Sequence, residues 1–202
     1  VARNLAARVE KLLPGWLAFW FMSLYLFLRQ RALFDLTHKL GQSQRSSSDA
    51  LIAKWIREVG RDGYAVVPNF KSIEWCAAAR EELRQALTDP QRATQHSEDS
   101  RVFGIENLSV HAASFANDPR LLELASRYSR SKERLLFCMG NRVSFRSAQT
   151  YGSGGEWHRD GFRRELKAMI YLTDVNEADG PLAVLQRSHR WHRMARDVIL
   201  IG

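Results

Sequence analysis

The stretch that decides how this chain is interpreted is HRDGFRRELKAMIYLTDVNEADGPLAVLQRSHR, residues 158–190. It opens with a histidine and an aspartate two positions apart, His158 and Asp160. Residues i and i+2 of an extended strand point to the same face, so this imidazole and this carboxylate can converge on one ion. They supply two corners of a 2-His-1-carboxylate triad, which holds iron(II) and leaves positions open for other ligands. The spacing by itself also fits a surface histidine beside a salt-bridging aspartate.

A glycine-rich run, Gly152-Ser153-Gly154-Gly155, precedes this pair. Glycines allow irregular backbone and close approach at the rim of a pocket. No Gly-Lys-Ser/Thr follows them, which excludes a phosphate-binding loop of the nucleotide type. The run therefore indicates a turn beside the candidate metal site.

Short strand-forming segments separated by Gly, Asn and Asp fill the chain beyond Arg134. An earlier short strand, Tyr64–Val67, is stopped by Pro68, and the polar stretch Thr88–Ser100 is predicted to be a loop. The strands that we predict in the later part are Leu135–Met139, Val143–Tyr151, Leu166–Thr173 and Pro181–Leu185.

Helices are predicted before these strands. Ser48 or Asp49 can cap a helix whose apolar residues recur at helical spacing, and Ser72 can cap the next one. A third helix starts at Asp118-Pro119, a capping residue followed by proline in the first turn. Helices followed by serial short strands predict an α+β fold whose antiparallel strands form a sandwich or barrel.

Several motifs accompany the His-x-Asp pair in a fixed order. Tyr171-Leu172-Thr173-Asp174, Asp179-Gly180-Pro181-Leu182 and Ser188-His189 follow it, and DGYAVVPNF at residues 62–70 precedes it and leads into a helix. In order and spacing these motifs resemble the phytanoyl-CoA dioxygenase family of iron(II)/2-oxoglutarate-dependent oxygenases. The resemblance covers roughly Ile56 to Arg190, most of the chain beyond its polar linker.

The resemblance implies a double-stranded β-helix, a jelly-roll or cupin-like fold, with N-terminal helices and with iron at the open end of the barrel. It implies a dioxygenase that uses Fe(II), 2-oxoglutarate and O2 to hydroxylate a small-molecule or lipid-like substrate, releasing succinate and CO2. His158 and Asp160 map onto the first two iron ligands of the family and are the expected catalytic centre. The substrate itself does not follow from the sequence.

Two departures from the family pattern affect these expectations. Gln186-Arg187 stands where the family usually has Pro-Gly, which changes a turn. The family's second iron-binding histidine and the basic residue that holds 2-oxoglutarate lie well downstream, whereas this chain stops at Gly202. We therefore expect a fold incomplete at its C-terminus and a fragment inactive without those two residues. His189 matches the Ser-His tail and His192 follows too soon for a return strand, so neither is expected to replace the missing ligand.

Two residues are candidates for holding 2-oxoglutarate. Gln149 sits where the resemblance places a side chain that contacts this cosubstrate, and a water-facing strand residue is the equal alternative. Lys167 alternates with Met169 and Tyr171 along a predicted strand and could pair with a cosubstrate carboxylate. Its alternative is a surface lysine whose stem covers apolar atoms.

An uncharged run, LLPGWLAFWFMSLYLFL at residues 12–28, lies near the N-terminus between basic residues. Its length is at the lower limit for crossing a bilayer, and its tryptophans and tyrosine suit a membrane interface. A helix packed on its own domain or on a partner is the alternative. We divide the chain into a hydrophobic helical segment (1–40), a polar linker (41–48) and a partial oxygenase domain (49–202).

The overall composition narrows the classes of partner and compartment. Lys and Arg number 30 against 22 Asp and Glu, a net charge of +8, and 45% of residues are hydrophobic, which is ordinary for a globular protein. No zinc-finger spacing or RNA-recognition motif accompanies the charge, so we expect no nucleic-acid partner. The basic surface and apolar leader favour an anionic or lipid-linked substrate. Two cysteines cannot form a disulfide framework, which favours the cytoplasm, with membrane association through residues 12–28 left open.

Two rival functions stay open at this point. A barrel that has lost its metal could be a non-catalytic binding module for a sugar or lipid. Alternatively, the N-terminal run could make the chain a membrane-tethered interaction protein. The tether is compatible with oxygenase activity, so it bears on location more than on chemistry.

Overall fold

The computed structural model describes residues 15–32, 49–96, 99–129, 137–143 and 157–201. Its contacts divide the chain into two compact units, which we describe one at a time. The first comprises Val1–Ala65, Arg159–Glu165 and Val184–Gly202, and the second comprises Val66–His158 and Leu166–Ala183. Each unit is therefore assembled from segments that lie far apart in the sequence.

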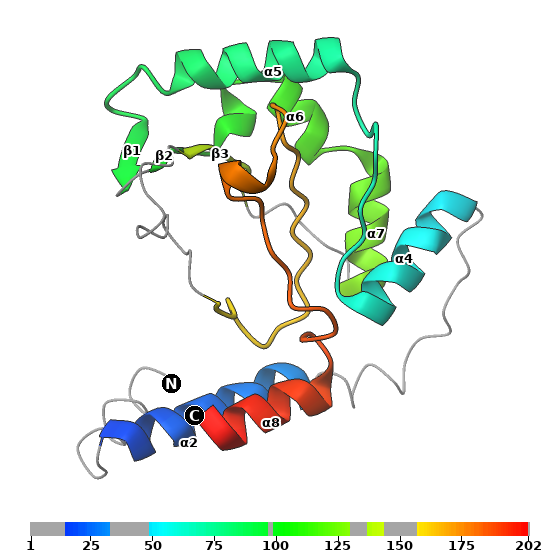
Figure 1. The fold of residues 1–202 in the computed structure, drawn as a ribbon, viewed down its shortest axis with the longest axis vertical. Coiled ribbons are helices and arrows are strands. Elements are labelled where there is room, and N and C mark those ends of the chain that lie inside the picture. The colour runs from blue at the N-terminus through cyan, green and yellow to red at the C-terminus, as the bar shows by residue number, and fades with distance from the viewer. Residues whose placement is uncertain (1–14, 33–48, 97–98, 130–136, 144–156, 202) are drawn as a thin grey trace. The chain divides into compact units, whose positions relative to one another are not determined.

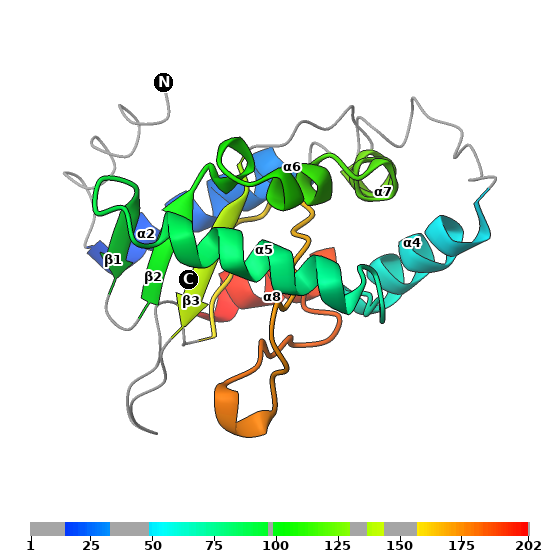
Figure 2. The same cartoon turned by 90° about the horizontal axis from the view of Figure 1, so that it is seen from above.

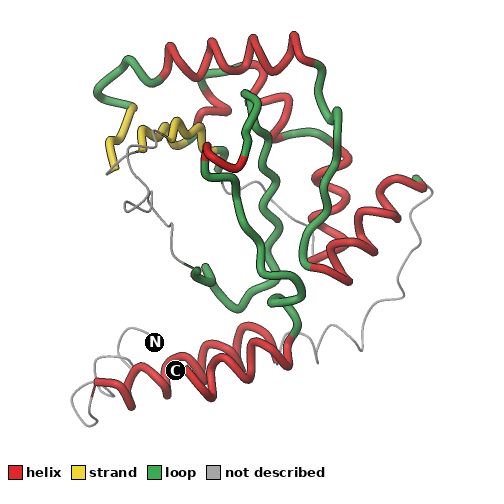
Figure 3. The backbone as a smooth tube through the Cα atoms, viewed as in Figure 1, coloured by secondary structure: helices red, strands yellow, loops and turns green. Residues whose placement is uncertain are grey.

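Helices build the first unit (Figure 1). Helix α2 spans Gly15–Phe27 and continues into a π-helical turn, Leu28–Ala32. Helix α4 spans Ala50–Asp62, and helix α8 spans Trp191–Ile201. Helices α2 and α8 lie side by side, as the tube in Figure 3 also shows.

The contact between α2 and α8 is apolar. Phe27 of α2 is buried with Met194 and Val198 of α8. Phe162 packs onto this cluster, with its ring edge-to-face on Phe27 at a centroid distance of 5.7 Å. The alternative of a helix packed on its own domain therefore describes α2. No helix in the described ranges is long and apolar enough to cross a bilayer, and membrane contact by residues 12–28 stays a prediction.

Helix α4 begins and ends as its sequence predicts. The Asp49 carboxylate accepts hydrogen bonds from the backbone N–H groups of Leu51 at 2.8 Å and Ile52 at 3.4 Å, which confirms the predicted N-terminal cap. The helix ends where Gly63 adopts φ +94°, a left-handed conformation that glycine takes without strain.

A turn formed by residues 186–190 binds the carbonyls at the C-terminal end of α4. Arg187 N–H donates to Asp62 O at 2.8 Å, His189 Nε2 to Gly60 O at 3.2 Å, and Arg190 Nη2 to Arg61 O at 3.3 Å. These carbonyls have no partner within the helix, so the turn supplies the bonds that the helix end lacks. The negative end of the helix dipole also favours the two arginines.

The second unit contains an antiparallel sheet covered by a helix (Figure 2). Helix α5, Ile73–Ala86, is capped by Ser72 Oγ as predicted. In the described residues the sheet has three strands in the order β1-β2-β3: Ala93–His96, Asp99–Phe103 and Met139–Val143. The central strand, β2, pairs antiparallel with both neighbours.

The core of this unit lies between α5 and β2. Leu83 of α5, Val102 of β2 and Ile105 form a buried cluster, onto which Cys138 and Leu172 pack. Strand β3 approaches so closely that a Cβ on Gly140 would overlap the Leu83 side chain and come within 2.7 Å of Ile105 Cδ1. Glycine at position 140 is therefore required by packing rather than by a turn.

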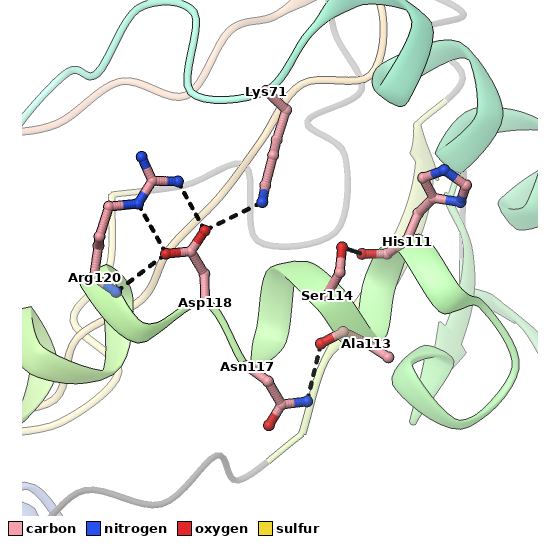
Figure 4. Close-up of polar contacts among 7 residues, drawn as sticks. All are labelled: Lys71, His111, Ala113, Ser114, Asn117, Asp118 and Arg120. Atoms are coloured by element: carbon pink, nitrogen blue, oxygen red, sulfur yellow. Dashed lines mark hydrogen bonds and ion pairs between the residues drawn. The ribbon is translucent and has the colours of Figure 1, made fainter.

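Short helices complete the second unit. They are the 3-10 turns Ile105–Asn107 and Glu177–Asp179 and the α-helices α6 (Val110–Ala116) and α7 (Pro119–Ser129). Asp118 starts α7, as predicted. Its buried carboxylate accepts hydrogen bonds from Lys71 Nζ at 3.1 Å, from the Arg120 guanidinium at 2.8 and 3.0 Å, and from Arg120 N–H at 3.1 Å (Figure 4). Arg120, with support from Lys71, lowers the pKa of Asp118 to about 2.

Several predicted strands are wrong or only partly placed. Thr88–Ser100 contains β1 and the start of β2 instead of a loop, because β2 pairs with strands on both of its edges. The third strand begins at Met139, not Leu135, and residues 144–151 lie outside the described residues. The segments Tyr64–Val67, Leu166–Thr173 and Pro181–Leu185 form no strand, since none has a ladder partner in the described part of the chain.

The predicted fold class is correct at the level of α+β content, with helices in both units and a small antiparallel sheet in the second. The complete double-stranded β-helix stays a prediction. The division at residues 40 and 48 also stays a prediction, because the linker lies outside the described ranges.

Replacing Gly63 and Gly60 tests the end of α4. Gly63→Ala should lower the free energy of unfolding by about 1–3 kcal/mol, because φ is positive and the new Cβ would lie 2.7 Å from His189 Nδ1. Gly60 is the matched control: it lies inside the helix with nothing within 4 Å of a Cβ, so Gly60→Ala should be neutral or stabilise by up to about 1 kcal/mol. Urea unfolding measures both, and equal losses would contradict the proposed geometry.

Replacing Asp118 tests the cap of α7. Asp118→Ala should destabilise the protein by about 2–4 kcal/mol, because it removes the cap and leaves the mostly buried Lys71 ammonium without its carboxylate. Asp89→Ala is the control, since the Asp89–Arg92 pair is exposed, and it should cost clearly less. The two variants are compared by thermal unfolding at neutral pH.

Candidate functional site

The His-x-Asp pair lies in a segment without helix or strand. Both side chains are exposed. The division between the two units falls immediately after His158, so His158 belongs to the second unit and Asp160 to the first. In the sequence, Arg159 is the one residue between His158 and Asp160.

Arg159 is bound at both ends of its guanidinium. Nη2 donates to Asp197 Oδ2 of α8 at 2.9 Å, and Nη1 donates to the Ser188 carbonyl at 3.1 Å. Both side chains of the ion pair are half-buried, at 27% and 33% exposed. Arg196 also approaches Asp197, with 3.7 Å between Nη2 and Oδ1. The residue between the two candidate ligands is therefore held to α8 and to the turn that precedes it.

A second anchor lies two residues beyond Asp160. Phe162 packs against Phe27, Met194 and Val198 in the core of the first unit. Within that unit Asp160 thus lies between a polar anchor, Arg159, and an apolar anchor, Phe162. Its backbone position is set by packing on both sides, while its carboxylate stays exposed.

The candidate cosubstrate residues are less well defined. Gln149 lies outside the described residues. Lys167 is exposed in a segment with no strand. Exposure alternates only in the second half of this segment: Met169 and Tyr171 are exposed while Ile170 and Leu172 are partly covered, whereas Lys167 and its neighbour Ala168 are both exposed.

The side chains of His158 and Asp160 can be compared with the ligands that iron(II) requires. An imidazole and a carboxylate are ligands of the right kind, and both are exposed to a metal ion arriving from solvent. Within the described ranges, no group of three or more His, Cys, Asp and Glu side chains is arranged to hold a metal. His158 and Asp160 therefore fit an iron site in kind, and they remain candidates for two of the three ligands of a facial triad.

His189 has a structural role in the turn. Its Nε2 donates to Gly60 O, and its buried Nδ1 has no hydrogen-bond partner. Burial lowers the pKa of His189, and the nearby Arg31, Arg190 and Arg164 lower it further. These contacts agree with the expectation that His189 is not an iron ligand.

Another polar cluster joins α5 to α6. The Glu82 carboxylate accepts hydrogen bonds from Ser109 Oγ and from His111 Nδ1, the latter at 2.7 Å. Burial would raise the pKa of Glu82, but these bonds hold it below its usual value. The carboxylate lies between hydroxyl and imidazole, so His111 is not placed to deprotonate Ser109 as in a hydrolase triad. The cluster ties two helices together.

Comparison with known proteins decides the family. The model of the phytanoyl-CoA dioxygenase (PhyH) family matches residues 59–199, which include His158, Asp160 and every motif listed after them in the sequence. The chain belongs to the PhyH family. This match confirms the resemblance inferred from the ordered motifs. Dependence on iron(II) and 2-oxoglutarate is a general property of the PhyH family.

Three curated relatives carry the name ectoine dioxygenase. Those of Bordetella parapertussis and Bordetella bronchiseptica are each 29% identical over 157 residues, covering 71% of this chain and 51% of the relative. That of Stutzerimonas stutzeri is 30% identical over 158 residues, covering 69% of this chain and 51% of the relative. The chain thus spans about half the length of the curated PhyH relatives it matches. No solved structure gives a significant match.

Sequence reasoning missed Arg159. Arg159 is the middle residue of the His-x-Asp motif, and the motif itself assigns no role to that position. The available signal was Asp197, an acid flanked by the arginines of an otherwise basic C-terminal stretch. Such an isolated acid marks the place where a distant cation can bind.

The neutral His189 makes the stability of the first unit depend on pH. Because its pKa is lower in the folded chain than its ordinary value of 6.5, the unfolded chain binds the proton more readily. The stabilisation is complete above about pH 6.5 and is lost as the pH falls below it. We expect the urea midpoint of the parent protein to fall between pH 7 and pH 5, and His189→Gln to flatten this fall. The exposed His192 is the control, and His192→Gln should retain the parent slope.

Proposed function

We propose that this chain carries two of the iron ligands of an Fe(II)- and 2-oxoglutarate-dependent dioxygenase that hydroxylates a small molecule. The supporting observation is the His158-x-Asp160 pair inside the PhyH match, with an imidazole and a carboxylate both exposed on one short segment. The relatives are named for ectoine, so ectoine is the first substrate to test. An anionic or lipid-linked compound is the second, because of the net charge of +8.

The proposed roles follow from the chemistry of each side chain. Neutral His158 donates a nitrogen lone pair, and ionised Asp160 supplies an anionic oxygen, so together they bind a divalent cation on one side. Gln149 and Lys167 bind 2-oxoglutarate, the lysine through a charge-assisted hydrogen bond to a carboxylate. When bound, iron(II) supplies the redox chemistry by which O2 and 2-oxoglutarate convert a substrate C–H to C–OH, with release of succinate and CO2.

The fold proposed for residues 49–202 is the double-stranded β-helix with N-terminal helices. The antiparallel sheet β1-β2-β3 and the alternating exposure of residues 169–172 support it. In such a barrel the ligands project from strand ends toward the open mouth, which explains why an iron site would be exposed at its rim. Free Cys76 and Cys138 are compatible with the cytoplasm, which we propose as its location.

The rival functions receive no support from these comparisons. The matched relatives are named as dioxygenases, not as binding modules. For the membrane-tethered interaction protein, Phe27 of α2 is buried against α8, although Phe19 and Phe21 of the same helix are exposed.

Removing either proposed iron ligand tests this function directly. Iron(II) and 2-oxoglutarate are added anaerobically to the full chain, and their charge-transfer absorption is followed by titration. We expect His158→Ala and Asp160→Asn each to lower iron affinity at least about tenfold, because each removes a direct ligand. Acidification should also weaken binding in the parent, since protons compete with the metal for both side chains.

His192→Ala is the matched control, because His192 is an exposed histidine on α8 outside the proposed site. It should bind iron like the parent protein. If His158→Ala also binds iron like the parent, the site assignment is wrong. Because little turnover is expected without a third iron ligand, equilibrium binding of ectoine to the iron-loaded chain tests the substrate separately.

A further inference from the structure

The residue between the two proposed ligands has the most specific contacts in this part of the chain. Arg159 makes two hydrogen bonds, one to the Asp197 carboxylate at 2.9 Å and one to the Ser188 carbonyl at 3.1 Å. The carboxylate and the carbonyl come from different structures, helix α8 and the 186–190 turn. A guanidinium held by two acceptors fixes both its position and its plane.

Fixing Arg159 restricts the backbone on both sides of it. The peptide groups on either side of this residue lead directly to His158 and to Asp160. Because the chain is continuous, anchoring residue 159 limits how far the backbone of its two neighbours can move. A loose segment would have to lose this rotational freedom when a metal binds, which would weaken the affinity for the metal.

The same contacts determine where the positive charge of Arg159 lies. A guanidinium free to approach the proposed site would repel a divalent cation and compete for the Asp160 carboxylate. Instead, the charge of Arg159 is paired with the carboxylate of Asp197, a residue of α8. Because this ion pair is only about one-third exposed, solvent screens it only partly. Arg196 lies 3.7 Å from the other oxygen of Asp197 and so binds this carboxylate less closely than Arg159 does.

We propose that Arg159 is a positioning residue for the iron site: by binding Asp197 and the Ser188 carbonyl, it holds the backbone between His158 and Asp160 ready for metal binding and keeps its own charge away from the metal. This inference rests on the proposed function. It makes α8 part of the support of the site, although α8 provides no ligand. Phe162 supplies the corresponding apolar anchor on the other side of Asp160.

Metal binding by the full chain tests this inference. Mn(II) is used as a stand-in for iron(II) because it does not oxidise in air, and the free ion is counted by its electron paramagnetic resonance signal. Outer contacts that orient metal ligands commonly change affinity 10–100-fold, so we expect Arg159→Gln to weaken Mn(II) binding about tenfold. Asp197→Asn should have a similar effect, and the double variant should be little worse than either single one, because both break the same ion pair. Arg159→Lys should restore part of the affinity.

Arg163→Gln is the matched control. Arg163 is an exposed arginine on the same segment, so its loss changes the net charge equally, and binding should stay within about twofold of the parent. Thermal unfolding of every variant, with metal binding measured well below the melting temperature, separates positioning from stability. A purely structural role would lower the melting temperature of Arg159→Gln and leave its affinity for Mn(II) unchanged, and that result overturns the inference.

His158→Ala and Asp160→Asn are measured alongside. If they lose Mn(II) binding while Arg159→Gln keeps it, the proposed function stands and the positioning role fails. If the parent and these two variants bind Mn(II) alike, the proposed site fails, and the positioning role fails with it. Weaker binding by Arg159→Gln and Asp197→Asn, with normal binding by Arg163→Gln, supports both.

Discussion

The first unit depends on satisfying the carbonyl groups at the C-terminal end of α4. A helix leaves its last carbonyls without internal partners, and here residues 187, 189 and 190 supply the hydrogen bonds. The bond from His189 to Gly60 spans 129 positions of the chain. The turn made in this way leads directly into α8, whose Asp197 then binds Arg159. Hydrogen bonding at one helix end thus helps to place α8, the helix that binds the residue between the two candidate ligands.

Local signals in the sequence were enough to predict the helices. Asp49, Ser72 and Asp118 each cap a helix as expected, since a cap involves a side chain and backbone groups only two or three residues away. The His-x-Asp motif could also be recognised from the sequence. It is defined by one residue between the histidine and the aspartate and by the order of the motifs that follow. The family match over residues 59–199 agrees with that order.

Features that depend on distant partners could not be predicted from the sequence. The polar stretch from Ala93 to Ser100 looks like a loop, yet it pairs as strands because β2 has neighbours on both edges. Leu166–Thr173 has the composition of a strand but forms none in the described structure. Arg159 carries no local signal of its ion pair, since Asp197 lies 38 positions away. The sequence therefore indicates which residues could bind iron but not what holds them in place.

The packing of α2 against α8 has a practical consequence for the expression of shortened forms of this chain. A clone trimmed to the family match would begin at residue 59 and discard Phe27 and Arg31. Met194 and Val198 would then lose their contact with Phe27 and keep only Phe162, and the Arg31 hydrogen bond to the His189 carbonyl would be lost. Such a trimmed protein would expose more of the apolar face of α8, the helix whose Asp197 binds Arg159. Poor solubility of a shortened clone would then reflect the loss of a packing partner for α8.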